Sequence, residues 1–231
     1  MTKISDLPPG QIEYPSFDRF GLGLFAKRFP TETNKATISI RGNLETPITI
    51  CNELYALPTI EQTSDFHCVT TWSVRNQHWS GFRFRDFYNL IVVPQCKPRN
   101  EHSFVVFRGQ DNYAVSMQLK DLLQNDVLLA THLNAEKLTI KHGAPLRLVA
   151  PAHYGYKNPK HICAIEFWQD SSHYRFPFPY PNLMDHPRGR VAYEERAKFL
   201  PLWLVRPLYR LLQPGARRKH AKELKRHLKR K

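Results

Sequence analysis

The chain has 231 residues, of which 42% are hydrophobic and 12% aromatic, so it can bury a sizeable core and is not a disordered chain. Its four cysteines are widely spaced and form no Cys-x-x-Cys pair, which excludes the usual zinc motifs and argues against a disulfide framework. The net charge is +14, and residues 206–231 carry +10 of it, with eleven Lys or Arg against one acid. A basic segment of this kind suits an acidic partner, anionic lipid or nucleic acid, while the rest of the chain is nearly balanced.

The N-terminal third begins with an arm and continues into strands. Residues 1–35 are rich in Pro, Gly and aromatics, so we expect an extended arm with Phe20, Phe25 and Phe29 as anchors. Alternating apolar residues then predict strands at 36–42 and 48–50. A short helix is expected at 52–57, because Pro58 would end it.

The middle of the chain is rich in strands. Strands are predicted at 103–109, 137–141, 145–149 and 161–168, and a short helix at 117–123. There is no regular alternation of strand and helix, which favours a mixed, β-rich α+β fold over a doubly wound sheet.

The C-terminal part differs in composition from the rest. An aromatic, Pro-rich loop follows Trp168, and a helix is expected at 191–200. Residues 202–212 form an apolar segment with two arginines that Pro207 interrupts. Pro214-Gly215 predicts a turn, followed by a basic helix or disordered tail. We therefore divide the chain into an arm (1–35), a main domain (36–190) and a basic helical extension (191–231).

The sequence shows no export signal and no candidate membrane span. The first residues, MTKISDLPPGQIEYPSF, contain no apolar stretch and no twin arginine, and no segment approaches the length of a membrane span. We therefore expect a cytoplasmic protein, with contact to the inner face of the membrane through the basic tail as an open alternative.

The first candidate site is the run Asp-Phe-His-Cys-Val-Thr-Thr-Trp-Ser at 65–73, followed by Trp-Ser-Gly at 79–81. On these residues alone, Cys68 is as consistent with a buried structural cysteine as with a functional thiol. A thiol nucleophile with His67 as its base is a weaker alternative, because neighbours in a strand point apart.

The second candidate site is basic. It comprises Lys-His-Gly-Ala-Pro-Leu-Arg at 141–147 and the segment 151–160, which ends in Gly-Tyr-Lys-Asn-Pro-Lys. A glycine turn with an arginine and lysines at its edges can hold an anion such as phosphate. The alternative from charge alone is a hairpin with a solvated basic rim.

Taken together, the two segments resemble a known family. The runs Cys-Val-x-x-Trp-Ser, His-Gly-x-Pro-Leu-Arg-Leu and Gly-x-Lys-x-x-Lys occur in the order found in the molybdopterin-binding domain of the sulfite oxidase family. Within it, the chain is more similar to small bacterial proteins related to the catalytic subunit of the methionine sulfoxide reductase. The likeness covers about residues 36–170.

The resemblance implies a molybdenum–molybdopterin oxidoreductase that transfers an oxygen atom to or from a small sulfoxide, sulfite or N-oxide substrate. It implies that Cys68 binds molybdenum through its thiolate and is the catalytic residue. The further cofactor-binding positions that it implies are Arg28, Gly109, His142, Arg147, Tyr156, Lys157, Asn158 and Lys160. The chain lacks the Gly-Asn-Arg-Arg segment that sulfite oxidases proper carry after their cysteine, so it departs from the animal enzymes there.

Other functions remain open from the residues. One is a non-catalytic binding module with a cofactor-derived pocket and a basic tail; another is a cysteine hydrolase, which needs a distant His beside Cys68. The tail itself is either an anchor on anionic membrane, with Trp203 and Tyr209 at headgroup level, or an apolar segment docked on the domain. A redox partner protein is a further candidate for the tail, whereas nucleic acid has no motif in its favour.

Overall fold

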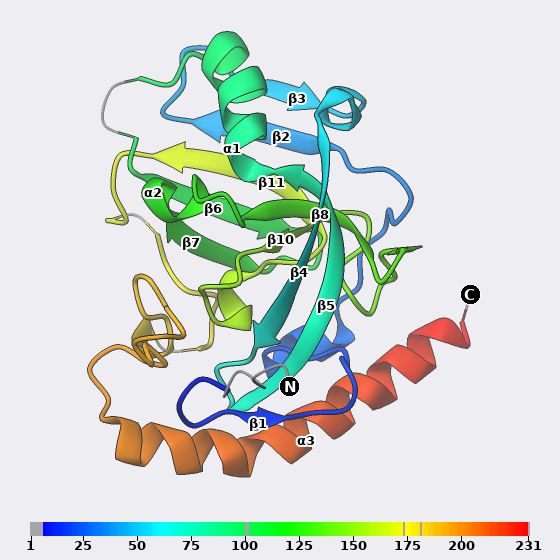
Figure 1. Cartoon of the computed structure of the whole chain (residues 1–231), viewed down its shortest axis with the longest axis vertical. Helices are drawn as coiled ribbons and strands as arrows, with labels where there is room; N and C mark the ends of the chain where they lie inside the picture. Colours follow the sequence, from blue (N-terminus) through cyan, green and yellow to red (C-terminus); the bar gives the residue numbers. More distant parts are fainter. Residues whose placement is uncertain (1–6, 100–101, 173, 181, 231) are drawn as a thin grey trace, which may run out of the picture.

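The computed structural model describes residues 7–99, 102–172, 174–180 and 182–230. One of its two sheets has five strands in the order β3-β2-β11-β6-β7 (Figure 1). Its strands are β2 (Ile38–Gly42), β3 (Ile48–Ile50), β6 (Phe104–Gly109), β7 (Ala114–Gln118) and β11 (Ile162–Trp168). β11 is parallel to β2, and the other neighbours are antiparallel. Four of these five strands lie where alternating apolar residues predicted them.

The second sheet has six strands along the path β1-β5-β8-β10, with β4 paired to β5 and β9 paired to β8. Its strands are β1 (Ile12–Glu13), β4 (Thr59–His67), β5 (Trp72–Arg83), β8 (Leu128–Leu133), β9 (Glu136–Lys137) and β10 (Arg147–Val149). β4 and β5 form a long hairpin that reaches the end of the molecule occupied by β1 and α3 (Figure 1). This hairpin, which carries Cys68 in its turn, was not among the strands predicted from the sequence.

Steric contact with β8 explains why position 81 of β5 is a glycine. A Cβ atom on Gly81 would lie 2.2 Å from the carbonyl oxygen of Leu129 in β8, so no larger residue fits there. The register between β5 and β8 shifts at Ser80/Gly81. The glycine of the Trp-Ser-Gly motif therefore serves the pairing of the two strands.

The predicted strand at 137–141 is mostly wrong. Only its first residue belongs to β9, because the chain then turns around the carbonyl oxygen of Thr139. That oxygen accepts hydrogen bonds of 3.0 Å each from the backbone N–H groups of His142, Gly143 and Ala144. These bonds replace a strand ladder and shape the turn of the second motif.

The main core lies between the two sheets. Buried residues of β2, β6 and β11 meet Phe82 of β5 and Leu129 of β8 there. A second cluster forms around Trp72 and Trp79, and Phe17 of the N-terminal arm belongs to it. The second cluster underlies the turn that carries Cys68.

The short helices agree only in part with the prediction. The helix expected at 52–57 is the 3-10 helix η2 (Glu53–Ala56), and the one expected at 117–123 is α2 (Leu119–Leu122). A helical stretch of α1 (Phe84–Phe87) and the π-helix η3 (Tyr88–Cys96) was not predicted. The helix expected at 191–200 is wrong, because residues 191–201 form turns and bends.

The C-terminal helix is longer than predicted. α3 runs without a break from Leu202 to Leu228, so the predicted turn at Pro214-Gly215 is wrong, as is a disordered tail over this range. Pro207 and Pro214 are seven residues apart on one exposed side of the helix. The hydrogen bonds that they cannot donate are therefore lost on the solvent side, where the helix tolerates lengthened bonds. Among the described residues, no helix has both the length and the apolar composition to span a membrane.

The described part of the N-terminal arm begins at residue 7 and is mostly extended. It pairs with β5 through β1, forms the 3-10 helix η1 (Gly23–Lys27) and packs η1 against α3 (Figure 1). Phe25 is buried, while Phe20 and Phe29 are half-buried. Two further short 3-10 helices, η4 (Gly155–Lys157) and η5 (Asn182–Met184), complete the elements. The arm and α3 thus cover the same end of the molecule.

Candidate active site

The turn that carries Cys68 joins β4 to β5. The backbone N–H of Cys68 donates to the carbonyl oxygen of Trp72 at 2.8 Å, and the N–H of Thr71 donates back to the carbonyl oxygen of Cys68 at 3.2 Å. Thr71 has a left-handed backbone conformation, with φ of 70°. Gln11 of the arm donates to the same Cys68 carbonyl at 3.2 Å. The thiol is therefore held by two paired strands and by the arm.

The sulfur of Cys68 is buried but has a hydrogen-bonding neighbour. The residue is 6% exposed, and its Sγ lies 3.2 Å from the Thr70 hydroxyl. Burial raises the pKa of the Cys68 thiol, while the Thr70 hydrogen bond acts in the opposite direction. All four cysteines are free of disulfides. Cys68 is therefore available to a soft metal.

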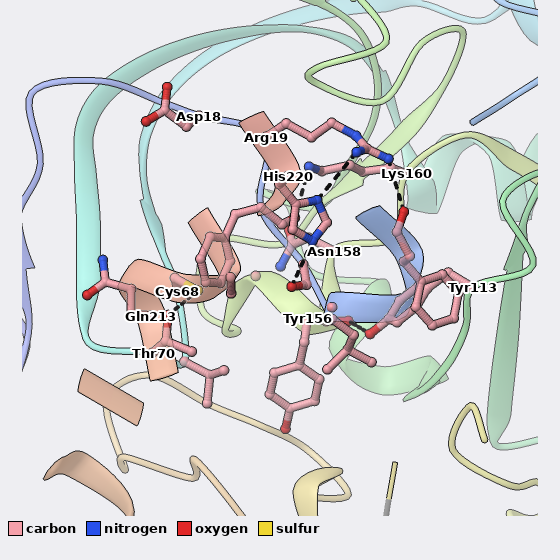
Figure 2. Close-up of a pocket in the computed structure, with 18 of the residues that line it drawn as sticks. Asp18, Arg19, Cys68, Thr70, Tyr113, Tyr156, Asn158, Lys160, Gln213 and His220 are labelled. Carbon is pink, nitrogen blue, oxygen red and sulfur yellow. Dashed lines mark hydrogen bonds between the residues drawn. The ribbon is translucent and has the colours of Figure 1, made fainter. Parts of the chain in front are cut away.

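A cavity of about 530 Å³ opens beside Cys68 (Figure 2). Its walls come from the arm, the Cys68 turn, the 155–161 loop and the inner face of α3. Polar lining residues include Arg19, Thr70, Asp111, Asn158, Lys160 and His220, and aromatic ones include Phe17, Phe20, Phe66, Trp72, Tyr113 and Tyr156. Small-molecule sites are typically about 300–1,000 Å³, so this cavity has the size of a cofactor site.

Lys160 is the principal cation of the cavity. Its Nζ lies 3.4 Å from the carbonyl oxygens of Phe20 and Lys141, and it forms no ion pair with the described residues. Burial, together with the charges of Arg147 and Arg19, lowers the pKa of Lys160 to about 7. An anion bound beside Lys160 would favour its charged form, so this end of the cavity suits a phosphate group.

Arg19 and His220 form the join between the arm and α3. The guanidinium of Arg19 donates to the carbonyl oxygens of Phe25, Ala26 and Arg28 at 2.8–3.1 Å. The ring of His220 contacts the Gly21 carbonyl oxygen at 3.0 Å and the Arg19 Nη1 at 3.4 Å. Figure 2 shows Arg19, His220 and Lys160 together on the side of the cavity away from Cys68.

The 155–160 loop brings Tyr156, Asn158 and Lys160, three of the expected cofactor-binding residues, to the cavity wall. The amide of Asn158 is used within the protein: its oxygen accepts from the N–H of Ala150 at 2.6 Å, and its nitrogen donates to the carbonyls of His153 and Tyr154. Asn158 therefore shapes the loop that faces the cavity.

Lys157, in contrast, does not line the cavity. Its Nζ is completely buried between the Asp185 carboxylate at 2.6 Å and the Ser116 carbonyl oxygen at 3.0 Å. Lys157 therefore has a structural role, because its ammonium forms a buried ion pair and a hydrogen bond within the protein.

His142 and Arg147 lie in a layer behind the cavity. Phe17, which lines the cavity, contacts the His142 ring at 4.9 Å and the Arg147 guanidinium at 5.7 Å between centres. Arg147 donates to the His142 carbonyl oxygen at 2.9 Å, yet its Nη2 has no hydrogen-bond partner among the described residues. Burial is the main cause that lowers the pKa of His142 to about 3, so its ring is neutral.

Arg28 and Gly109 also lie outside the cavity lining. The Arg28 guanidinium stacks 4.6 Å over the Phe25 ring, and only its backbone carbonyl meets Arg19. A Cβ on Gly109 would lie 2.6 Å from the backbone oxygen of Lys160. Gly109 therefore allows the Lys160 segment to approach β6 closely, a role that its sequence position did not suggest.

α3 contributes cavity residues that were not predicted from the sequence. Tyr209, Gln213 and His220 are buried toward the body and line the cavity. The pattern Val205, Tyr209, Gln213 with its four-residue spacing is typical of the buried stripe of a helix and could have revealed this face. Pro207 and Pro214 interrupt this pattern in the sequence and conceal the helix.

The structure argues against a cysteine hydrolase. Among the described residues, no histidine nitrogen hydrogen-bonds to the Cys68 sulfur, and the His67 Nδ1 instead contacts the Ser73 hydroxyl at 2.7 Å. A thiol whose pKa is raised by burial and which has no adjacent base is a poor nucleophile.

The donor set fits a cofactor with one soft-metal end and one anionic end. A single free thiol faces the cavity, Lys160 lies across it without a carboxylate partner within salt-bridge distance among the described residues, and the Arg147 Nη2 is unsatisfied in the layer behind. No group of three or more His, Cys, Asp or Glu side chains converges in the described part of the chain. The protein would therefore offer a metal one thiolate, with the remaining ligands supplied by the cofactor.

Comparison with known proteins agrees with this chemistry. Residues 26–176 match the family described as the oxidoreductase molybdopterin binding domain, which is more than half of the chain. The chain belongs to this family and is a molybdopterin-dependent oxidoreductase. The predicted α+β fold class, cofactor and enzyme class are confirmed.

Three individual proteins show how similar the chain is to known members and folds. The chain is 29% identical to the oxidoreductase YuiH of Bacillus subtilis over 166 residues, which cover 71% of this chain and 80% of YuiH. It is 30% identical over 198 residues to MsrP, the protein-methionine-sulfoxide reductase catalytic subunit of Campylobacter jejuni, covering 73% of this chain and 64% of MsrP. The sulfane dehydrogenase SoxCD of Paracoccus pantotrophus shares the fold, with a TM-score of 0.53 and 20% identity over 67% of this chain and 44% of that one.

Proposed function

We propose that the enzyme transfers an oxygen atom to or from a small substrate of the sulfoxide, sulfite or N-oxide type, and that Cys68 is the protein's thiolate ligand to molybdenum. The observation that carries the proposal is the position of Cys68. Its sulfur lies at the wall of a cofactor-sized cavity, on a turn held by two strands and the arm. The similarity to the methionine sulfoxide reductase subunit supports a sulfoxide as the first substrate to test.

When bound, the molybdenum cofactor supplies the oxygen-atom and two-electron chemistry, which no amino-acid side chain provides. Cys68 holds its thiolate at a fixed point of the cavity, and Thr70 supplies a hydroxyl 3.2 Å from the sulfur. A hydrogen bond from that hydroxyl stabilises the thiolate over the thiol.

Two other groups of residues orient the cofactor. Lys160 supplies positive charge on the far side of the cavity, where a phosphate group reduces the cost of keeping the lysine charged in a buried place. Aromatic side chains such as Phe66, Trp72 and Tyr113 line the walls and exclude water from the reacting end. His142 and Arg147 pack behind Phe17 and hold its ring in the cavity wall.

We propose a separate redox partner protein for the exchange of electrons, because the substrate reaction moves two electrons and the described residues line one cavity with a free thiol in its wall. The cytoplasmic location expected from the sequence stays a prediction.

The test of the proposed function compares Cys68→Ser with Cys51→Ser, both produced in a host that makes the pterin cofactor. Cys51 is a partly exposed cysteine outside the cavity lining, so it controls for loss of a thiol. We expect stoichiometric molybdenum and sulfoxide reduction with a reduced dye in the wild type and in Cys51→Ser. We expect both to be lost in Cys68→Ser, with an unchanged circular dichroism spectrum.

The contrary outcomes are distinct. Wild-type protein without molybdenum and without pterin fluorescence after oxidation would contradict the cofactor assignment. Full activity in Cys68→Ser would contradict the ligand assignment and favour the non-catalytic binding module. A panel of sulfite, sulfoxides and N-oxides then identifies the substrate class by its turnover.

A further inference from the structure

The outer face of α3 differs from its inner face in a way that the cavity does not explain. The inner face, with Val205, Tyr209 and His220, is buried against the body. The outer face of its first half carries large apolar side chains in solvent: Trp203 is 76% exposed and Leu211 is 79% exposed. A row of apolar side chains exposed to solvent indicates a binding site for a protein or a membrane.

The apolar row continues beyond the helix and along its first turns. Phe199, two residues before the helix-capping Pro201, is 87% exposed and holds a left-handed backbone conformation with φ of 66°. A bulky residue seldom adopts this conformation, so the chain accepts a local cost while the ring stays in solvent. Leu204 and Leu208 are also more than two-fifths exposed on the same helix. Together we call these five residues the apolar row: Phe199, Trp203, Leu204, Leu208 and Leu211.

The second half of α3 presents positive charge. Its exposed basic residues are Arg218, Lys219, Lys222, Lys225 and Arg226. Arg226 pairs with Glu223, the one acid of the helix, whereas Arg218, Lys222 and Lys225 form no ion pair with any described residue. The positive charge is therefore largely uncompensated by the protein. Lys219 also lines the cavity, so it is not part of the outer face. The other four recur at the helical spacing that places them on the side of Trp203 and Leu211, opposite the buried Tyr209 and His220.

Only some of the aromatic side chains on and near α3 are exposed on its outer face. The sequence suggested Trp203 and Tyr209 together, but Tyr209 is 6% exposed and its hydroxyl donates to the Arg196 carbonyl oxygen at 3.5 Å. Tyr209 therefore belongs to the body. Trp203 and Phe199 are the aromatics available to an external phase.

We propose that the outer face of α3 binds the surface of a membrane that contains anionic lipid, with the helix lying parallel to the bilayer. The apolar row enters the boundary between headgroups and acyl chains, and the basic half meets the lipid phosphates. Trp203 has the amphipathic ring that favours this boundary. A nucleic acid would use the basic half but leaves the apolar row unexplained, and an acidic protein surface does the same.

Binding in this way has a consequence for the cavity. The inner face of α3 is one wall of the cavity, so a helix on the bilayer places the cavity one helix diameter from the lipid surface, about 10 Å. A redox partner resident in the membrane could then reach the cavity while the helix lies on the bilayer.

The test uses flotation of the full-length wild-type protein with vesicles of phosphatidylcholine alone or with three parts in ten of phosphatidylglycerol. Two variants probe the two halves of the surface: Trp203→Ser with Leu211→Ser, and Lys222→Glu with Lys225→Glu. The matched control is Lys120→Glu with Lys137→Glu, which makes the same charge change at exposed positions of α2 and β9. Circular dichroism and thermal unfolding show that each variant is folded.

We expect the wild type and the control to bind the anionic vesicles, and binding to fall as salt is raised. The charge variant should lose about tenfold or more in affinity, since each basic residue near an anionic surface contributes about fivefold. The apolar variant should also lose affinity. Brominated lipid should quench fluorescence in the wild type, and the quenching should be lost in Trp203→Phe.

Three outcomes would overturn the proposal. The first is equal binding to neutral and anionic vesicles, and the second is an equal loss in the control variant. The third is binding of a DNA duplex or an RNA oligomer at the same salt without vesicle binding, which would assign the basic half to nucleic acid. Because none of these measurements uses molybdenum, they are independent of the assignment of Cys68.

Discussion

The guanidinium of Arg196 donates a hydrogen bond of 2.7 Å to the carbonyl oxygen of Val69, the residue after Cys68. Arg196 is completely buried, and its Nη2 donates at 3.0 Å to the carbonyl oxygen of Pro9 in the arm. Its neighbour Glu194 forms an ion pair with Arg206 of α3. One arginine thereby connects the Cys68 turn to the arm, and through Glu194 to the C-terminal helix.

We predict that Arg196→Lys lowers both stability and cofactor content. A lysine has a single ammonium and cannot reach two diverging carbonyl oxygens, so at least one is left buried without a partner. Loss of such a partner costs about 1–3 kcal/mol of unfolding free energy, which urea denaturation measures. Molybdenum content should fall with it, because the Cys68 turn loses its support.

The control for this prediction is Arg190→Lys. Arg190 pairs with Glu195 at a partly exposed position, where such pairs contribute about 1 kcal/mol or less. Equal effects of the two substitutions would show that Arg196 has no special relation to the Cys68 turn.

Acid should weaken the contact between α3 and the arm through His220. Burial is the main cause that lowers the pKa of His220 to about 4, and the neutral ring is the form that donates to Gly21 while accepting from Arg19. Since the unfolded chain takes up this proton at about pH 6.5, its contribution to stability is present above pH 6.5 and is lost as the pH falls toward 4.

We predict that His220→Gln flattens this pH dependence. One such proton contributes a slope of up to about 1.4 kcal/mol per pH unit, so unfolding free energies between pH 4 and 6.5 should depend less on pH in the variant. His78→Gln, at an exposed position, serves as the control and should leave the slope unchanged. Parallel curves for the wild type and His220→Gln would disprove the role of His220. Burial also lowers the pKa of other histidines, which should leave a residual slope in both: His67, His142, His153, His161 and His186.

Two glycines at the cavity should respond in opposite directions to alanine. A Cβ on Gly155 would lie 2.4 Å from the ring of Phe66, so this ring, which lines the cavity, would have to shift. We expect Gly155→Ala to cost about 1–3 kcal/mol of unfolding free energy and to reduce bound cofactor. Gly215 of α3 has nothing within 4 Å of a new Cβ, so Gly215→Ala should stabilise the helix by about 0.5–1 kcal/mol. Thermal unfolding and molybdenum analysis of both variants check the pair, and a stable, fully loaded Gly155→Ala would contradict the steric argument.

The residues alone predicted several features that depend on neighbours in the chain. Alternating apolar residues in β2 and β11 predicted those strands, because the side-chain period of a strand is visible over a few residues. The motifs around Cys68 and Lys160 indicated the family and its cofactor, and the structure places both residues at one cavity. The charge count placed the positive charge in the tail.

Only the tertiary structure decided how distant segments share the site. Pro207 and Pro214 predicted an interrupted helix, but both lie on the outer face of α3, where the lost hydrogen bonds face solvent and the buried inner face holds the helix together. His220 reaches Arg19 of the arm only because burial of that face brings the two ends of the chain together. Likewise, Phe17 places His142 and Arg147 behind the cavity. Such contacts depend on packing between segments far apart in the sequence, which a local pattern does not encode.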